Sequence, residues 1–162
     1  MMLDLPRHRL SVALLQPQIA PNTGNIARLC VATGTELHLV RPLGFVLSDR
    51  QLRRSAMDYW PRLNLSLHDS TAEFVRAMTG RRLWFFDSTG ATSLWDATFR
   101  DGDVLVFGSE TKGIDQMILG EWPERTVRLA QIAGERCLNL STSVGIATYE
   151  ALRQVVSTRA PH

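Results

Sequence analysis

The sequence predicts an α/β fold with a mainly parallel sheet and helices on both faces of that sheet. Short β-rich runs alternate along the chain with segments of helical periodicity, an order typical of parallel sheets. Three polar loops, at Gln16–Asn25, Gly108–Gly113 and Gln131–Asn139, follow predicted strands, where open α/β sheets bind their ligands. The 162 residues contain no repeats, low-complexity tracts or linkers, so we expect a single domain over residues 1–162.

Six strands are expected, at Leu10–Leu15, Glu36–Val40, Leu63–Leu67, Arg82–Phe86, Asp103–Phe107 and Thr126–Leu129. Five helices are expected, at Asn22–Thr33, Ser48–Met57, Ser70–Thr79, Ile114–Leu119 and Ser141–Ser157. Ser48 and Ser70 each precede a periodic segment and are expected N-caps. The last helix carries an apolar stripe, typical of a core or a subunit contact, at Val144, Ala147, Ala151, Leu152 and Val155. Residues 157–162 are expected to form a frayed tail.

The composition excludes several classes of protein. The longest apolar runs, such as Val12–Leu15 and Leu83–Phe86, are far shorter than the roughly 20 residues of a transmembrane helix, so no membrane partner is expected. The amino terminus lacks the pattern of a signal peptide. Cys30 and Cys137 cannot form a disulfide framework or a four-ligand zinc site. We therefore expect two buried or partly buried free thiols, no metal and a cytoplasmic location.

Arginine dominates the basic residues, with Lys112 the only lysine among 18 basic side chains. Residues 1–81 carry ten arginines against six acids, whereas residues 82–162 carry eight basic groups against ten acids. An arginine-rich half suits phosphate recognition, because the guanidinium group binds phosphate oxygens bidentately. Genome base composition is an equally good explanation of the bias, and composition alone does not separate the two.

Common catalytic motifs are missing. No G-x-G-x-x-G follows the first predicted strand, and Gly108–Gly113 does not have the Walker spacing. The sequence also contains no G-x-S-x-G, H-E-x-x-H or C-x-x-C motif. The histidines are scattered, and His38 is expected to be a structural residue within a strand. Hydrolase, kinase and metalloenzyme functions therefore have no support in the sequence.

Two basic segments suit a phosphate-bearing ligand. Asn22 is expected to cap a helix, and Asn25 and Arg28 lie three residues apart on one face of that helix. The alternative is a surface arginine on a capped helix. A second basic face consists of Arg50, Arg53 and Arg54. These guanidinium groups could follow an RNA backbone or form a solvated charged face, and their spacing leaves both interpretations open.

Three ordered segments of the chain resemble the three motifs of the SPOUT methyltransferases. They are Leu15–Cys30, Leu105–Gly113, and Leu138–Ser141 followed by Tyr149–Gln154. Within this superfamily the chain, including its segment Arg50–Tyr59, is similar to the minimal tRNA 2′-O-methyltransferases that act on the wobble cytidine or uridine. The resemblance covers roughly residues 10–155.

The resemblance implies a knotted fold and a cofactor. In SPOUT enzymes the carboxy-terminal part forms a deep trefoil knot, in which backbone groups of three loops bind S-adenosylmethionine. Here Gln131–Ser143 would thread past Gly108–Gly113. A side chain at Gly108 would obstruct the ligand. The implied cofactor-binding residues are Phe86, Gly108, Glu110, Leu129, Leu138, Asn139 and Ser143.

The implied reaction is methyl transfer to the ribose 2′-hydroxyl of nucleotide 34 in tRNA. Arg28 would hold the target phosphate and stabilise the developing alkoxide, because an arginine side chain is practically never deprotonated in proteins. Tyr149 and Glu110 would orient the target or the cofactor, and the general base stays open. The anticodon stem-loop would be the partner of the implied RNA-binding residues, which are Asn25, Arg28, Arg50, Arg53 and Arg54.

The resemblance also implies a homodimer, in which Arg28 serves the cofactor of the partner subunit. We expect that dimer to bury the apolar stripe of the last helix and part of the first helix. Two positions depart from the family pattern, with Thr142 where asparagine is common and Ala130 where proline is common. Two alternatives stay open: a SPOUT enzyme for another tRNA or rRNA ribose, and a non-catalytic RNA-binding SPOUT module.

Overall fold

The apolar runs assemble into one parallel sheet in the computed structural model, which describes residues 5–48 and 58–158. The strands are β1 (Ser11–Leu15), β2 (Glu36–Val40), β3 (Leu65–His68), β4 (Leu83–Phe86), β5 (Thr92–Ser93), β6 (Val104–Phe107) and β7 (Thr126–Arg128). In the described part of the chain their order is β3-β2-β1-β6-β4-β7-β5, and each neighbouring pair is parallel. The predicted parallel sheet is confirmed.

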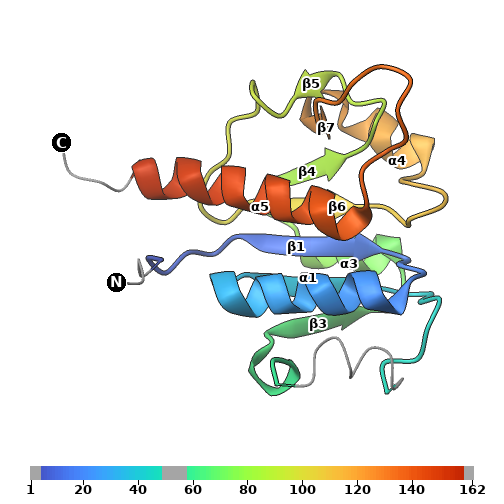
Figure 1. The fold of residues 1–162 in the computed structure, drawn as a ribbon, viewed down its shortest axis with the longest axis vertical. Helices are drawn as coiled ribbons and strands as arrows, with labels where there is room; N and C mark the ends of the chain where they lie inside the picture. Colours follow the sequence, from blue (N-terminus) through green and yellow to red (C-terminus); the bar gives the residue numbers. More distant parts are fainter. Residues whose placement is uncertain (1–4, 49–57, 159–162) are drawn as a thin grey trace.

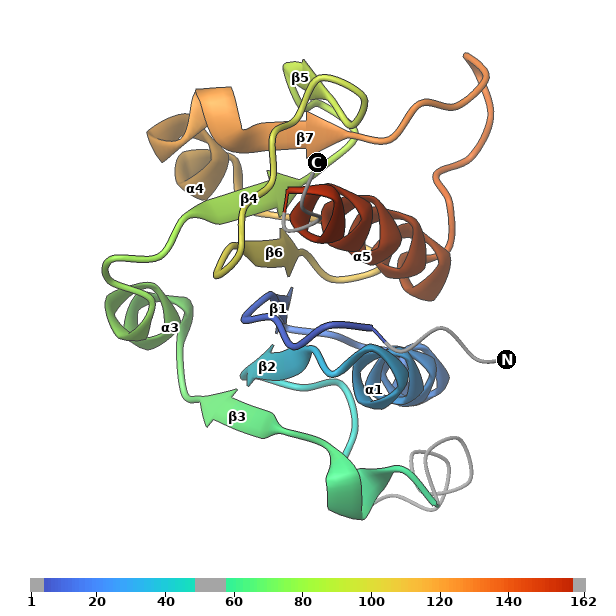
Figure 2. The same cartoon turned by 90° about the vertical axis from the view of Figure 1, so that its left-hand side faces the viewer.

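Helices cover both faces of this sheet, as predicted. They are α1 (Ala20–Thr33), α3 (Thr71–Ala77), α4 (Gln116–Glu121) and α5 (Leu140–Ser157), with 3₁₀ turns η1 (Trp60–Arg62) and η2 (Pro123–Arg125). Figure 1 shows α1 and α5 lying side by side in front of the sheet, and Figure 2 shows α3 and α4 on the opposite face from them. Within the described residues, no helix is long and apolar enough to cross a membrane.

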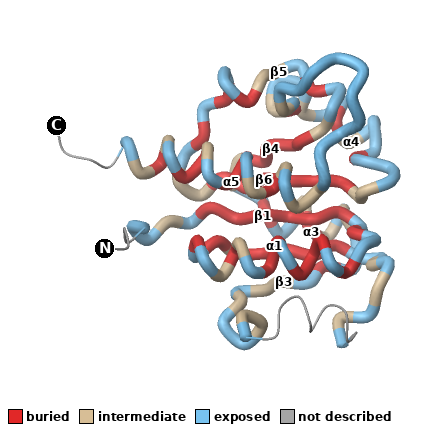
Figure 3. Tube along the Cα trace, viewed as in Figure 1, coloured by how far each residue is buried: buried red, intermediate tan, exposed pale blue. Residues whose placement is uncertain are grey.

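The core lies on both faces of the central strands. All residues of β1, β4 and β6 are buried, and these strands form the red centre of Figure 3. Ile26 and Ala27 of α1 and Val144 of α5 pack on one face, whereas Phe74 and Leu119 pack on the other. Two mainly aliphatic clusters, one on each face of the sheet, thus fix where the strands end and where the following loops begin.

The apolar stripe of α5 belongs to the core of its own chain. Val144, Ala147, Ala151, Leu152 and Val155 are all buried against the sheet and α1. The expectation that a dimer buries this stripe is therefore wrong. The stripe is already covered because α5 lies across the middle of the sheet beside α1, and another face of α5 is left for any partner (Figure 1).

The residues that join β7 to α5 form a long exposed connection. Residues 130–139 are all exposed, and in Figure 3 they make the pale blue loop between β7 and α5. Cys137 lies in this loop and is exposed, so the expectation of a buried or partly buried thiol is wrong there, because the loop has no core beneath it. Cys30 is buried in α1 as expected, and burial raises the pKa of its thiol to about 12.

Several element boundaries differ from the prediction. Helix α1 begins at Ala20 with Ile19 as its N-cap, so Asn22 lies inside the helix and does not cap it. Strand β5 was not predicted, because two residues carry no periodicity. Ser70 is the N-cap of α3, where its side chain accepts a hydrogen bond from the Glu73 amide. Most of the helix expected over Ser48–Met57 lies outside the described residues.

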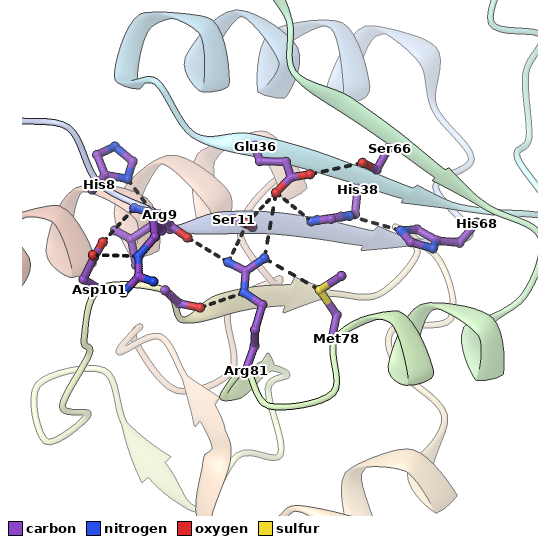
Figure 4. A network of polar contacts seen from close by, with 12 residues as sticks. His8, Arg9, Ser11, Glu36, His38, Ser66, His68, Met78, Arg81 and Asp101 are labelled. Atoms are coloured by element: carbon purple, nitrogen blue, oxygen red, sulfur yellow. Dashed lines mark hydrogen bonds and ion pairs between the residues drawn. The ribbon is translucent and has the colours of Figure 1, made fainter.

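A polar network stands at the amino-terminal edge of the sheet (Figure 4). The Glu36 carboxylate accepts hydrogen bonds from the hydroxyls of Ser11, at 3.3 Å, and Ser66, at 3.1 Å. His38 Nδ1 lies 3.0 Å from His68 Nε2, and His38 Nε2 lies 3.4 Å from Glu36 Oε2. Burial is the main cause that lowers the pKa of His38 to about 4. His38 is therefore neutral in the folded protein at neutral pH.

This burial makes stability depend on pH. Because the pKa of His38 is lower in the folded chain than in the unfolded chain, the unfolded state binds a proton between pH 6.5 and pH 4, and stability falls as pH falls through that window. Replacing His38 by glutamine should remove up to about 3 kcal/mol of this loss. Urea unfolding at pH 7 and pH 4.5 measures it, with the partly buried His8→Gln as the control. If the parent and His38→Gln lost the same unfolding free energy between pH 7 and pH 4.5, the loss could not be attributed to His38.

Candidate functional site

A cavity of about 940 Å³ lies at the carboxyl ends of β4, β6 and β7. Parallel sheets place their ligand sites at this edge. Every residue that the sequence assigned to a cofactor lines this cavity: Phe86, Gly108, Glu110, Leu129, Leu138, Asn139 and Ser143. The structure adds residues that the sequence did not assign to the cofactor, among them Ile19, the N-cap of α1, Asn22 of α1 and Phe107 at the end of β6. The three loops therefore meet at one place.

Glu110 joins the loop after β6 to the start of α1. Its Oε2 accepts a hydrogen bond from the amide of Gln18 at 2.8 Å, and its Oε1 accepts one from the amide of Ile19 at 3.1 Å. These two amides directly precede Ala20, the first residue of α1, and the helix dipole favours a negative charge at this end. The carboxylate thus stabilises the start of α1, where the N-cap Ile19 makes no side-chain cap hydrogen bond.

Asn22 and Asn139 extend this connection to the third loop. Asn22 Nδ2 donates to Glu110 Oε1 at 3.3 Å, and Asn22 Oδ1 accepts from Asn139 Nδ2 at 3.1 Å. Asn139 is also the N-cap of α5, because its Oδ1 accepts from the Ser141 amide at 2.9 Å. We call this run the Glu110–Asn22–Asn139 chain. It binds the loops after β1, β6 and β7 to one another.

Gly108 is required by the backbone of its own loop. A Cβ atom at this position would lie 2.1 Å from the carbonyl carbon of Gly113 and 2.5 Å from the amide nitrogen of Ile114. The loop is closed by a hydrogen bond from the Gly113 amide to the Ser109 carbonyl, at 3.0 Å. Obstruction of a ligand was the reason expected for this glycine. The structure supplies a different one, the close approach of two backbone segments.

One wall of the cavity is aromatic. The rings of Phe86 and Phe107 are stacked with centroids 4.7 Å apart and planes inclined by 13°. Leu129 and Leu138 contribute further apolar surface, and the backbone of the three loops contributes polar groups. Cys137 also lines the cavity, as does Ala130, the position where proline is common. This combination suits a ligand with a flat apolar part and polar groups that bind to backbone atoms.

The other predicted residues do not line this cavity. Arg28 and Asn25 are exposed on α1, and Arg28 lies six residues beyond Asn22, or about 9 Å along the helix axis. Tyr149 is 57% exposed on α5, and Thr142 is exposed in the first turn of α5. The chain therefore brings the cofactor candidates together but not Arg28 or Tyr149. The remaining RNA-binding candidates lie outside the described residues: Arg50, Arg53 and Arg54.

Comparison with known proteins identifies the family. The model of the SpoU rRNA Methylase family matches residues 9–149. The chain belongs to the SpoU family. It is 45% identical over 144 residues to a tRNA (cytidine(34)-2′-O)-methyltransferase of Methylovorus glucosotrophus, with 88% of this chain and 94% of the relative covered. It is 38% identical over 147 residues to the enzyme of that name in Escherichia coli K12, with 90% and 94% covered.

Solved structures of SpoU-type proteins share the fold. A structure described as giving insights into the 2-OH methylation of C/U34 on tRNA superposes with a TM-score of 0.88 at 45% identity, covering 94% of this chain and 99% of that one. A putative RNA methyltransferase from Bacillus anthracis gives a TM-score of 0.84 at 38% identity, with 90% and 93% covered. These neighbours, with the family match, confirm the SPOUT fold and so imply the knot that the three motifs predicted.

The contact at Gly108 gives a direct test of the site geometry. Gly108→Ala should lower the free energy of unfolding by more than about 3 kcal/mol, because backbone atoms have to move to admit the methyl group. The matched control is Gly120→Ala in α4, where a Cβ atom meets nothing within 4 Å. That change should stabilise the SpoU-family chain by about 0.5 kcal/mol. Urea unfolding measures both, and equal effects of the two substitutions would refute the stated reason for Gly108.

Proposed function

We propose that this chain transfers a methyl group from S-adenosylmethionine to the ribose 2′-hydroxyl of the pyrimidine at position 34 of tRNA. The observation that carries the proposal is the meeting of the three motif loops around one cavity through the Glu110–Asn22–Asn139 chain. The relatives from M. glucosotrophus and E. coli, which span nearly the same length, support cytidine as the target base. Because the substrate is tRNA, we propose that the protein acts in the cytoplasm.

The cavity suits the proposed cofactor. Its volume falls within the range of about 300–1,000 Å³ that is usual for small-molecule sites. Phe86 and Leu129 offer apolar surface for a base, and Gly108, Asn139 and Ser143 lie where loop backbone groups approach a ligand. When bound, S-adenosylmethionine supplies an electrophilic methyl group on a positively charged sulfur. The task left to the protein is to align the ribose oxygen with that methyl group and to disperse the charge of the oxygen.

We assign Glu110 a positioning role. Both of its carboxylate oxygens already accept hydrogen bonds from the start of α1, so this carboxylate fixes the cavity wall. Because three hydrogen bonds hold this carboxylate to residues 18–22, we assign it to positioning and not to removal of the ribose proton. Tyr149, which is exposed on α5, stays a candidate for orienting the target.

Arg28 is proposed to act on the RNA in the cavity of a second copy. It is exposed on α1 and does not line the cavity of its own chain, so a homodimer would complete two sites at once. The guanidinium group would hold the target phosphate and stabilise the alkoxide as it forms, since it keeps its proton throughout. Asn25 on the same helix face would contact the RNA beside it. Arg50, Arg53 and Arg54 would contact the backbone of the anticodon stem.

The function is tested by supplying the protein with bulk tRNA and S-adenosylmethionine labelled in its methyl group, and by mapping the labelled ribose. We expect label at the 2′-oxygen of nucleotide 34. Label at another ribose would overturn the proposed position, and the absence of transfer together with retained tRNA binding would show a binding module.

Removing Arg28 should separate catalysis from cofactor binding. Arg28→Ala should lower the single-turnover rate by about a hundredfold or more, as the loss of a preorganised electrostatic group does. Its affinity for S-adenosylmethionine should stay at the parental value, because the proposed contacts of Arg28 are with the phosphate and the ribose oxygen of the RNA and not with the cofactor. The comparison variant is Arg53→Ala, which should flatten the salt dependence of tRNA binding by about one unit per lost phosphate contact. A parental rate in Arg28→Ala would show that the role assigned to Arg28 is wrong.

A further inference from the structure

The ring of Tyr59 lies close to two arginine side chains. The guanidinium carbon Cζ of Arg28 is 5.2 Å from the centroid of the ring, and that of Arg62 is 5.6 Å from it. Both distances fall within the range of about 6 Å in which the face of an aromatic ring attracts a cation. Arg28 comes from α1, whereas Tyr59 and Arg62 come from the segment that leads into β3, so the tertiary fold brings them together.

Tyr59 has a firm position in the fold. Its carbonyl accepts a hydrogen bond from the amide of Arg62, at 2.9 Å, which closes the turn η1. The next residue, Trp60, packs with Leu63 against the core cluster that contains Ile26 of α1. The ring therefore approaches α1 from a turn that is fixed to the same core as α1. A side chain held in this way can orient a flexible neighbour.

The two guanidinium groups carry uncompensated charge. Among the residues that the structure describes, no carboxylate forms an ion pair with Arg28 or Arg62, although several other arginines have such a partner. Among the described residues, Arg62 makes a long hydrogen bond from Nη2 to the carbonyl of Asp58, at 3.4 Å. Both arginines are exposed. An aromatic ring orders a guanidinium group without neutralising it, so both groups stay available to an anion.

We propose that Tyr59 is a positioning residue for Arg28 and that the Arg28–Tyr59–Arg62 stack receives a phosphodiester of the RNA substrate. The inference rests on the proposed function, because it assumes that Arg28 acts on RNA. Tyr59 reduces the number of orientations of the Arg28 side chain before the RNA arrives, so less side-chain entropy is lost on binding. Arg62 adds a second positive group on the same ring and contributes to binding of the backbone.

The test compares Tyr59→Phe, which keeps the aromatic face, with Tyr59→Leu, which removes it. Tyr59→Phe should keep the single-turnover rate within about twofold of the parent, and Tyr59→Leu should lower this rate about fivefold at saturating tRNA. The affinity for S-adenosylmethionine should be unchanged in both. In an Arg28→Ala background, Tyr59→Leu should have no further effect, because the two residues act as one unit. Tyr59→Met serves the same comparison if Tyr59→Leu does not fold.

A second measurement tests the role of Arg62 through tRNA binding and does not depend on turnover. Arg62→Gln should flatten the salt dependence of tRNA binding by about one unit. The control is Arg76→Gln on α3, an exposed arginine on the opposite face of the sheet. Equal salt slopes of tRNA binding for these two variants would show that Arg62 does not contact a phosphate of the RNA.

The outcomes separate the inference from the proposed function. If Arg28→Ala methylates at the parental rate, the role of Arg28 is wrong whatever Tyr59 does. If Arg28→Ala loses turnover but Tyr59→Leu behaves as Tyr59→Phe does, the positioning role of Tyr59 is overturned and the function stands. A loss in Tyr59→Leu of the same size with and without Arg28 would also overturn it, because it would show a general structural effect.

Discussion

The hydrogen bonds of the Glu110 carboxylate to the start of α1 are the interaction on which the site depends. The N-cap Ile19 makes no side-chain cap hydrogen bond, and the amides of Gln18 and Ile19 donate to a carboxylate from the loop after β6. Asn22 also accepts a hydrogen bond from the side chain of Asn139, and Asn139 is the N-cap of α5. Hydrogen bonds at the starts of two helices thus join three segments that are distant in the sequence. The cavity is the space that they enclose at the carboxyl edge of the sheet.

The same arrangement leaves Arg28 outside the cavity of its own chain. The end of α1 that meets Glu110 belongs to the cavity, whereas Arg28 lies about two turns further along on an exposed face beside Tyr59. In the proposed dimer, the cavity of one copy and Arg28 of the other copy would form one site. The proposed dimer follows from this separation, and it explains how so short a chain could bind both a cofactor and an RNA. The apolar stripe of α5 is buried in the core of its own chain, so the proposed dimer would form through other surfaces.

The sequence predicted whatever depends on local periodicity or on ordered motifs. The apolar runs of β1, β4 and β6 and the cap at Ser70 are local signals, and the three motifs indicated the cavity residues. The bridging role of Asn22 could not be predicted, because its position after a loop suggests a cap and its partners are 88 and 117 residues away. The contact between Gly108 and Gly113 depends on how the loop closes. The approach of Arg28 to the ring of Tyr59 depends on tertiary packing.

The central claim is that one chain supplies the cavity and a second supplies Arg28. The most direct measurement mixes Arg28→Ala subunits with Asn139→Ala subunits, whose cavity has lost its link to Asn22 and the cap of α5. After dissociation and reassociation, a mixed dimer holds one intact site, formed by the cavity of the first subunit and Arg28 of the second. We predict that each variant alone is nearly inactive and that the mixture recovers about a quarter of parental activity, since half of the dimers are mixed. Activity of the mixture no greater than the mean of the two variants would contradict the claim.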